Sequence, residues 1–258
     1  MTYFMGIDIG STSVKGVIIK SGRLLAEHQL PSGADYRAAA VDLSSQLLER
    51  AGLASQQIAG TVITGHNVTG LTFANKRAAD IRCCARGISR LFPEVRTVID
   101  IQAMSSRVIQ LSDAGRVINF VTSEKCAAGS GRFLEIVANI LKVDIKEIGR
   151  LSLKSRRPIS FTTSCAVFGE AEVISRVAEG AAVADILAGA HRALADKLAT
   201  LIDRLGLEPS CAISGGGGLD KGLRHSLEER LGVTLLVPER PRLVTALGAA
   251  IMAKEMAA

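Results

Sequence analysis

The sequence predicts an α/β protein built from two related lobes, and three observations support this fold class. A unit of short strands that begins at Ile7 recurs at Ile99, 92 positions later. Helical periodicity follows both copies of the unit. Finally, 48% of the 258 residues are hydrophobic, enough to bury a sizeable core in one large domain or two smaller lobes.

The first copy reads as three consecutive strands followed by helices and a further strand. Its strands are β-branched runs bounded by Gly and Ser, with a tight turn at residues 21–23. Apolar residues then recur at helical spacing, where Ala40, Leu43 and Leu47 supply much of the apolar face. The predicted elements are strands at 7–9, 17–19 and from Leu24, a helix at 38–53, a strand at 61–64 and a helix at 78–91.

The second copy begins with the same three strands and carries more helices. Its second and third strands are separated by a turn at residues 113–116, which ends in Gly and Arg like the turn of the first copy. The predicted elements are strands at 99–101, 108–111 and from Val117, helices at 131–141, 169–178 and 182–205, a strand at 212–214, a helix from about Leu219 and a closing helix after Thr245.

Two such units joined end to end predict two lobes with a cleft between them. Residues 1–93 are expected to form the first lobe and residues 94–258 the second. Because no Pro-rich or Ser-rich linker separates the copies, we expect a hinge near Pro93 and not a flexible tether. The last helix is expected to pack back across this hinge.

Composition argues against nucleic-acid binding and against a membrane protein. The net charge of +6 is spread along the chain, and aromatic residues make up only 3%, with no Trp, so base-stacking platforms are hard to build. Charged residues or Gly interrupt the apolar stretches well before the roughly 18 residues that a membrane span needs. Five cysteines are an odd number without a secretion signal, which favours a reducing compartment. We therefore expect a soluble, cytoplasmic protein.

The segment 6–15 combines residue types that suit a phosphate site. Asp8 ends the first strand, and a turn with one glycine and three hydroxyls follows it. Glycine lets backbone amides approach phosphate, hydroxyls donate hydrogen bonds, and a carboxylate can hold Mg²⁺ through water. An ordinary hairpin with polar turn residues explains the same pattern. The candidate residues are Asp8, Gly10, Ser11, Thr12, Ser13 and Lys15.

Four consecutive glycines form a second candidate for nucleotide binding. They follow a predicted strand and precede a helix, so the backbone can pass against a base and ribose while the helix offers free amides. A long flexible turn is the simpler alternative. The glycines are Gly215, Gly216, Gly217 and Gly218. The sequence contains no G-x-x-x-x-G-K-[ST] motif, which excludes a P-loop.

Two of the five cysteines stand where a helix is about to begin. Cys126 precedes the helix at 131–141, and Cys165 precedes the helix at 169–178. The positive end of a helix dipole stabilises a thiolate there. A four-iron cluster needs about four thiolates, so two chains would be required to supply them. Alternatively, both cysteines are small buried hydrophobes.

The other metal-ligand candidates carry little signal. Cys83 and Cys84 fall inside a predicted helix and Cys211 inside a predicted strand, so we interpret them as packing residues. The four histidines show no metal-ligand spacing, and surface or capping positions are expected for them. They are His28, His66, His191 and His225.

Together these segments resemble the ATP-dependent activators of 2-hydroxyacyl-CoA dehydratases and the related ATPase subunits of benzoyl-CoA reductase. The resemblance covers nearly the whole chain. It is carried by the opening segment 6–12, the two cysteine segments at 125–133 and 164–168, the segment 170–175 and the closing segment 246–250. The two cysteine segments are highly specific, and they favour the cluster interpretation over buried hydrophobes.

The resemblance implies a fold, cofactors and partners. The fold would be the two-lobed type of actin, Hsp70 and hexokinase, a duplicated ribonuclease H-like fold with a nucleotide cleft. Asp8 and Asp100 would face Mg²⁺ and the phosphates of ATP or ADP, and Gly215 to Gly218 would flank the adenosine. A dimer, with itself or with a related subunit, would share one [4Fe-4S] cluster through Cys126 and Cys165.

The same resemblance implies a role in anaerobic metabolism. Ferredoxin or flavodoxin would donate an electron to the cluster, and nucleotide turnover would drive that electron at low potential into a CoA-thioester dehydratase or reductase component.

The sequence departs from the family pattern at the second phosphate motif. Where the family typically has Asp-Ile-Gly-Gly-Gln-Asp, residues 102–105 are Gln, Ala, Met and Ser. Their side chains would crowd the space for a γ-phosphate, and neither Met104 nor Ser105 replaces the carboxylate. In addition, residues 64–67 lack the Tyr-Gly-Arg continuation. We therefore expect slow hydrolysis by this chain.

Three hypotheses follow. The first is an ATPase subunit for electron transfer, paired with itself or with an intact relative. The second is a nucleotide-binding iron–sulfur scaffold or regulatory subunit with impaired hydrolysis. The third is a small-molecule kinase of the same fold, which would need an acidic base near the cleft that the sequence does not reveal.

Overall fold

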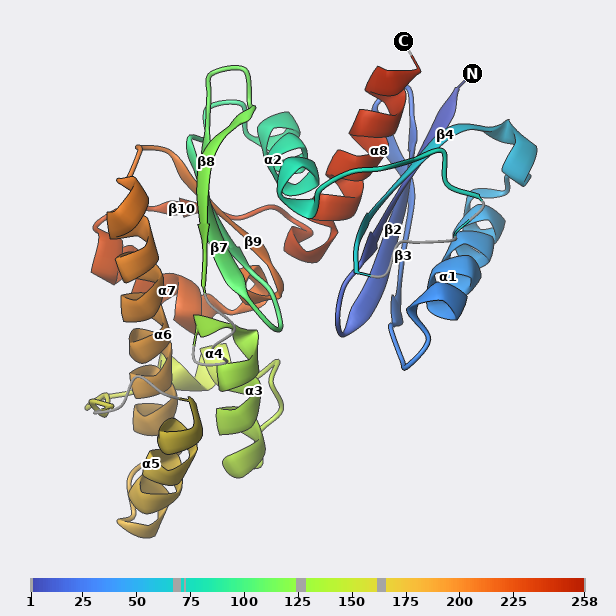
Figure 1. Cartoon of the computed structure of the whole chain (residues 1–258). Coiled ribbons are helices and arrows are strands. Elements are labelled where there is room, and N and C mark those ends of the chain that lie inside the picture. The colour runs from blue at the N-terminus through green and yellow to red at the C-terminus, as the bar shows by residue number, and fades with distance from the viewer. Residues whose placement is uncertain (1, 67–70, 72, 124–128, 162–165, 258) are drawn as a thin grey trace. The chain divides into compact units, whose positions relative to one another are not determined.

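The protein is described by a computed structural model that covers residues 2–66, 71, 73–123, 129–161 and 166–257 (Figure 1). The chain divides into two compact units. Unit 1 comprises Met1–Val95, Leu111–Ile118 and Pro238–Ala258, and unit 2 comprises Arg96–Gln110 and Asn119–Val237. Each unit is built around a five-stranded mixed sheet with helices.

The sheet of unit 1 has the strand order β3-β2-β1-β4-β5, and β1 pairs antiparallel with β2 and parallel with β4. A two-residue hairpin turn joins β2 to β3. Its two central residues, Ser21 and Gly22, have positive φ values of 50° and 83°, as the tight turns of β-hairpins require. The elements are β1 (Tyr3–Ile9), β2 (Ser13–Lys20), β3 (Arg23–Pro31), α1 (Tyr36–Ala51), β4 (Ile58–Gly65), β5 (Lys76–Arg77), α2 (Asp80–Leu91) and α8 (Val244–Met256), with short 3₁₀ turns at Ser55–Gln57 and Pro241–Leu243.

Two helices cover opposite faces of this sheet (Figure 1). Helix α1 packs on the face that carries Met5 and Ile7, and α8 packs on the face that carries Phe4 and Val17. Alternate residues of a strand point to opposite faces, which explains why Phe4 and Met5 belong to separate cores. Helix α8 is rich in Ala and Gly, and it also packs closely against α2.

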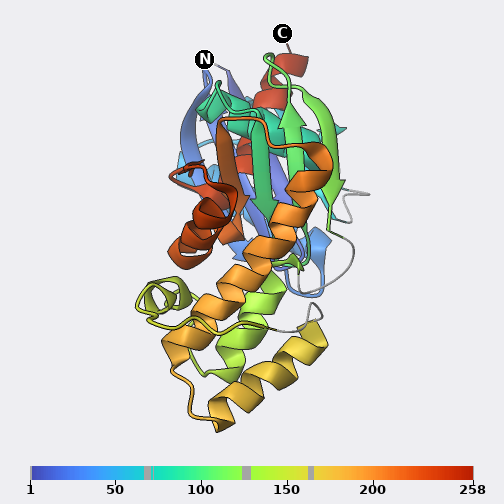
Figure 2. The same cartoon turned by 90° about the vertical axis from the view of Figure 1, so that its left-hand side faces the viewer.

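The sheet of unit 2 has the order β10-β9-β6-β7-β8, with β6 antiparallel to β7 and parallel to β9. Figure 2 shows the long helix α6 running past this sheet, with α3 and α5 near its N-terminal half. The elements are β6 (Thr97–Ile101), β7 (Ser106–Leu111), β8 (Val117–Thr122), α3 (Gly131–Ile140), α4 (Ile148–Ser152), α5 (Ala166–Ala178), α6 (Val183–Leu205), β9 (Cys211–Gly215), a 3₁₀ turn η3 (Gly216–Leu219), α7 (Lys221–Leu231) and β10 (Leu235–Leu236).

The two sheets repeat one another residue by residue, as the sequence repeat predicts. Asp8 of β1 stands opposite Lys15 of β2, and Asp100 of β6 stands opposite Arg107 of β7. On the parallel side, Asp8 is paired with Thr64 and Asp100 with Ser214. The predicted α/β fold with a duplicated strand unit is confirmed, while the division at residues 93 and 94 stays a prediction.

The described part of the chain holds no helix long and apolar enough to cross a membrane. The three cysteines expected to serve packing do so: Cys83 and Cys84 are buried in α2, and Cys211 is buried in β9. The short elements α4, β5 and β10 escape prediction, because a run of two to five residues gives no readable periodicity.

Candidate functional site

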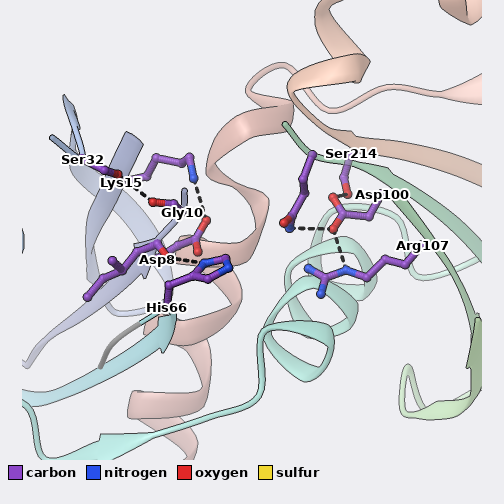
Figure 3. Close-up of polar contacts among 10 residues, drawn as sticks. Asp8, Gly10, Lys15, Ser32, His66, Asp100, Arg107 and Ser214 are labelled. Atoms are coloured by element: carbon purple, nitrogen blue, oxygen red, sulfur yellow. Dashed lines mark hydrogen bonds and ion pairs between the residues drawn. The ribbon is translucent and has the colours of Figure 1, made fainter. Parts of the chain in front are cut away.

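The first half-site, defined as Asp8, residues 10–13 and Lys15, lies where β1 ends and β2 begins. Lys15 Nζ donates to Asp8 Oδ2 over 2.9 Å, and the two side chains are 13% and 8% exposed (Figure 3). The ion pair follows directly from the antiparallel register of the two strands. It fixes a carboxylate at the strand end, immediately before a turn whose hydroxyl residues are partly or fully exposed.

Two further side chains support this turn. Ser32 Oγ donates to the Gly10 carbonyl over 2.6 Å, and the Ser32 amide donates to the Thr12 carbonyl over 3.1 Å. On the other side the His66 amide donates to the Ile9 carbonyl over 2.8 Å, with His66 Nδ1 3.3 Å from the same oxygen (Figure 3). The backbone of the turn is therefore anchored on both sides, which suits a site that must present amides in fixed directions.

The second half-site, defined as Asp100, Gln102, Arg107 and Ser214, repeats the first in unit 2. Asp100 is 1% exposed and accepts three hydrogen bonds from the described residues (Figure 3). Ser214 Oγ donates to Oδ1 over 2.7 Å, while Gln102 Nε2 and Arg107 Nε donate to Oδ2 over 2.9 and 2.8 Å. Lys15 is the side-chain donor that the described residues provide for Asp8, so the two carboxylates differ in how fully they are occupied.

A glycine ends the parallel strand beside each half-site, at equivalent positions in the two sheets. Gly65 ends β4 with φ of 97°, and Gly215 ends β9 with φ of 78°. A Cβ on Gly65 would collide with the Ile9 carbonyl oxygen, and a Cβ on Gly215 with the Ile101 carbonyl oxygen. Both positions need glycine for their backbone conformation and for the close approach of the neighbouring strand.

The glycine turn, defined as residues 215–219, follows β9 and leads into α7. Gly216 is exposed and Gly218 is buried. A Cβ on Gly217 would lie 2.6 Å from Ile101 Cβ, so the turn packs directly on the end of β6. The four candidate glycines thus lie beside Asp100 within unit 2, Gly215 as the last residue of β9 and the other three in one short 3₁₀ turn, and they do not form a long flexible loop.

The altered loop at residues 102–105 also holds the start of helix α3. The amides of Gly131 and Arg132 donate to the carbonyls of Gln102 and Ala103, each over 2.9 Å. These amides belong to the first turn of α3, where intrahelical partners are missing. Ser123 hydrogen-bonds Ser106 through both its amide and its hydroxyl. The chain before and after residues 124–128 is therefore tied to the second half-site.

Cys126 and Cys165, the candidate cluster ligands, lie outside the described residues. In the part that is described, no group of three or more His, Cys, Asp or Glu side chains is arranged to hold a metal ion. Burial raises the pKa of the Cys83 thiol to about 12, and burial also raises the pKa of Cys211. Neither thiol is suited to act as a thiolate at neutral pH.

The expectation that the histidines are surface or capping residues is wrong for His191. This side chain is 0% exposed, and its Nε2 lies 2.9 Å from Asp220 Oδ2. His191 follows Gly189 and Ala190 on the apolar face of α6, and only the fold brings it to Asp220, 29 residues later. No spacing rule in the sequence identifies this pair.

The sequence also does not predict the contacts that three other polar residues make at the half-sites. Ser32 and His66 reach the first turn by donating hydrogen bonds to its backbone carbonyls, contacts that no sequence motif indicates. Gln102 was expected to crowd a phosphate, and it also binds Asp100. The repeat itself offered a signal for Arg107, because it matches Lys15 in position and charge.

The sequence matches the model of the BadF/BadG/BcrA/BcrD ATPase family over residues 5–253. The 2-hydroxyisocaproyl-CoA dehydratase activator of Clostridioides difficile is 38% identical over 252 residues, 97% of this chain and 94% of the relative. The (R)-2-hydroxyglutaryl-CoA dehydratase activating ATPase of Acidaminococcus fermentans is 36% identical, with 99% and 98% covered. A benzoyl-CoA reductase subunit of Thauera aromatica is 34% identical, with 90% and 84% covered.

Solved structures agree with these similarities. The activator of the 2-hydroxyisocaproyl-CoA dehydratase from Clostridium difficile, solved with bound ADPNP, superposes with a TM-score of 0.95 at 37% identity, covering 99% of this chain and 96% of that one. Component A of the Acidaminococcus fermentans (R)-2-hydroxyglutaryl-CoA dehydratase gives 0.96 at 36%, covering 100% and 99%. A ROK family glucokinase from Streptomyces griseus gives 0.63 at 14%, covering 98% and 99%, a likeness of fold alone.

Proposed function

The chain belongs to the BadF/BadG/BcrA/BcrD ATPase family, and we propose that it is an ATP-dependent activator that delivers a low-potential electron to a CoA-thioester dehydratase or reductase. The observation that carries this proposal is the likeness, over almost the full length of both chains, to two dehydratase activators, one of them solved with ADPNP. The small-molecule kinase becomes the weaker hypothesis, since glucokinase shares only the fold.

The first half-site fits a magnesium nucleotide. The buried Asp8 carboxylate at the end of β1 would hold Mg²⁺ through water, and the ion pair with Lys15 fixes the orientation of that carboxylate. The turn at residues 10–13 would offer amides and hydroxyls to phosphate, with Ser32 and His66 holding its backbone. In unit 2, the exposed Gly216 in the glycine turn would leave room for the adenosine.

Cys126 and Cys165 would hold one half of a shared [4Fe-4S] cluster. Thiolates are the usual ligands of such clusters, and two per chain match a cluster bridging two subunits, whether identical or related. The cluster would supply one-electron chemistry, accepting an electron from ferredoxin or flavodoxin for transfer to the CoA-thioester component. The buried, weakly acidic thiols of Cys83 and Cys211, together with the burial of Cys84, support assigning this role to Cys126 and Cys165.

One observation favours the second hypothesis, a nucleotide-binding iron–sulfur subunit with impaired hydrolysis. Asp100 accepts hydrogen bonds from Gln102, Arg107 and Ser214 and is almost wholly buried. A carboxylate has about four lone-pair positions, so three donors leave little capacity for a metal-bound water. A subunit of this kind would bind nucleotide and cluster while a related subunit hydrolyses ATP.

Calorimetry with ADP and Mg²⁺ tests the nucleotide site. We expect the wild-type chain to bind ADP and Gly216→Val to bind it more weakly by roughly 1 to 3 kcal/mol, the cost of a lost or strained buried hydrogen bond. Gly216 is exposed and has no positive φ, so this change spares the core, and Ala59→Val at an exposed position near the start of β4 is the control. Absence of ADP binding by the wild type would reject the proposal.

A further inference from the structure

The buried pair formed by His191 and Asp220 adjoins the glycine turn but has no part in the site described above. Asp220 immediately follows the turn and caps α7: its Oδ1 accepts from the amides of Gly222 and Leu223 over 2.9 and 3.1 Å. Its Oδ2 faces His191 Nε2 at 2.9 Å. The Asp220 amide in turn donates to the Gly217 carbonyl over 3.1 Å. One residue therefore links α6, α7 and the glycine turn.

Two glycines make room for this pair. A Cβ on Gly222 would collide with Ser152 Oγ and lie 2.8 Å from His191 Nδ1 and Cε1. A Cβ on Gly149 of α4 would collide with Asp220 Oδ1 and lie 3.0 Å from the Gly222 and Lys221 amides. Two separate helices thus lack side chains at the positions where the imidazole and the carboxylate meet, which is the arrangement expected of a site that requires close backbone approach.

Burying this polar pair costs desolvation free energy, so we look for a role that an apolar residue could not fill. An apolar side chain in α6 would fill the same space without a polar group to desolvate, and no hydrogen-bond partner is found for His191 Nδ1 within the described residues. What an apolar residue cannot supply is a directional donor that fixes the rotation of the Asp220 carboxylate. With Oδ2 held by His191, Oδ1 stays aimed at the amides of Gly222 and Leu223, the second and third residues of α7.

The glycine turn needs such an external anchor. Four of its five residues are glycines, which lose more conformational freedom on ordering than any other residue type. Gly215 and Gly217 both lie against Ile101, and the Gly217 carbonyl accepts a hydrogen bond from the amide of Asp220, which follows the turn. Ligand binding is tighter when the entropy of ordering has been lost beforehand.

We propose that His191 is a positioning residue for the nucleotide, holding the glycine turn in its binding conformation through Asp220. This inference rests on the proposed nucleotide site. It predicts that removing the His191 donor weakens ADP binding and loosens the turn, although His191 itself does not touch the ligand.

The test compares His191→Phe, which keeps a ring but no donor, with His191→Gln, which keeps a donor. His191→Phe should weaken ADP binding about threefold to tenfold, the size of one hydrogen bond, and His191→Gln should restore most of it. Leu198→Ala, in the buried face of the same helix and away from Asp220, is the control for lost stability alone. Asp220→Ser, which still caps α7 but does not reach His191, should resemble His191→Phe even if that variant folds poorly.

Hydrogen exchange of the nucleotide-free protein separates this inference from the proposed function. Faster exchange at the amide of residue 220 in His191→Phe and Asp220→Ser, but not in His191→Gln, would support positioning without any ligand. Equal ADP affinities in wild type and His191→Phe, or an equal loss in Leu198→Ala, would overturn it. No ADP binding by the wild type, with the exchange pattern intact, would reject the proposed nucleotide site and with it the role assigned to His191.

Discussion

At the scale of single residues, the two strand-end carboxylates have diverged within a shared frame. Asp8 and Asp100 occupy equivalent positions, and each pairs with a cation on the neighbouring strand. The second carboxylate is additionally bound by Gln102 and Ser214. Gln102 therefore has two effects on the second half-site: it occupies the Asp100 oxygen, and it adds bulk where the family pattern has glycine.

Restoring the family pattern at residues 102–105 should raise ATP turnover. The change to Gly-Gly-Gln-Asp removes the Gln102 hydrogen bond from Asp100 and reinstates a carboxylate. ADP affinity should change much less than the rate, because contacts made only in the transition state affect turnover without an equal effect on ground-state binding. Steady-state turnover and ADP calorimetry on both proteins measure the two quantities. Wild-type turnover as fast as that of the restored variant would contradict this account of the loop.

The sequence could predict the ion-pair frame but not the full polar environment. The repeat places Lys15 and Arg107 at equivalent distances from an aspartate, so antiparallel pairing alone brings each cation to its carboxylate. Contacts across the fold are different, because the pair formed by His191 and Asp220 depends on how α6 packs against α7. The sequence therefore does not reveal the burial of His191.

At the scale of elements, the chain that leads towards Cys165 is fastened to the start of α6. Asp185 Oδ1 accepts from Ser155 Oγ over 2.6 Å and from the amides of Arg156 and Arg157, each over 3.0 Å. The Ile159 amide donates to the Asp185 carbonyl over 3.0 Å. The hydrogen bond from Ser155, followed by those from the two amides, lowers the pKa of Asp185 below its usual value of 3.8.

Asp185 should therefore stabilise the protein in a pH-dependent way. Since its folded pKa is depressed, its contribution is complete above the usual value of 3.8 and is lost as the pH falls through the lower folded pKa. Asp185→Ala should lower the melting temperature at neutral pH, and the difference from wild type should shrink in acid. Asp203→Ala, an exposed acid on the same helix, serves as control. A difference that stays constant down to the acid limit would argue against the carboxylate clamp.

Long, periodic elements were predictable, and their ends were less so. The predicted helix at 182–205 is α6 (Val183–Leu205), and the predicted strand at 212–214 is β9 (Cys211–Gly215). Helix α1 begins at Tyr36 and not at residue 38, because Asp35 caps it and this cap lies outside the apolar periodicity. Helix α4 has five residues, too few for a periodic signal, and it is placed by its packing against α6 and α7.

At the scale of the whole molecule, the chain repeats one sheet topology and carries one half-site in each unit. Unit 2 additionally carries both candidate cluster cysteines. Its second half-site is tied by hydrogen bonds to the start of α3 and, through Ser123, to the chain before residues 124–128. The central claim of the proposed function is a cluster that bridges two subunits through Cys126 and Cys165.

Iron and sulfide analysis of the anaerobically purified protein, with its oligomeric mass, tests this claim most directly. We predict a brown protein with about four irons and four sulfides per two chains, because each chain supplies two of the roughly four thiolates that a cubane needs. Cys126→Ser and Cys165→Ser should each abolish the colour, while Cys211→Ser, which changes a buried thiol in β9, should keep it. Full iron content in both of the first two variants would contradict the shared cluster.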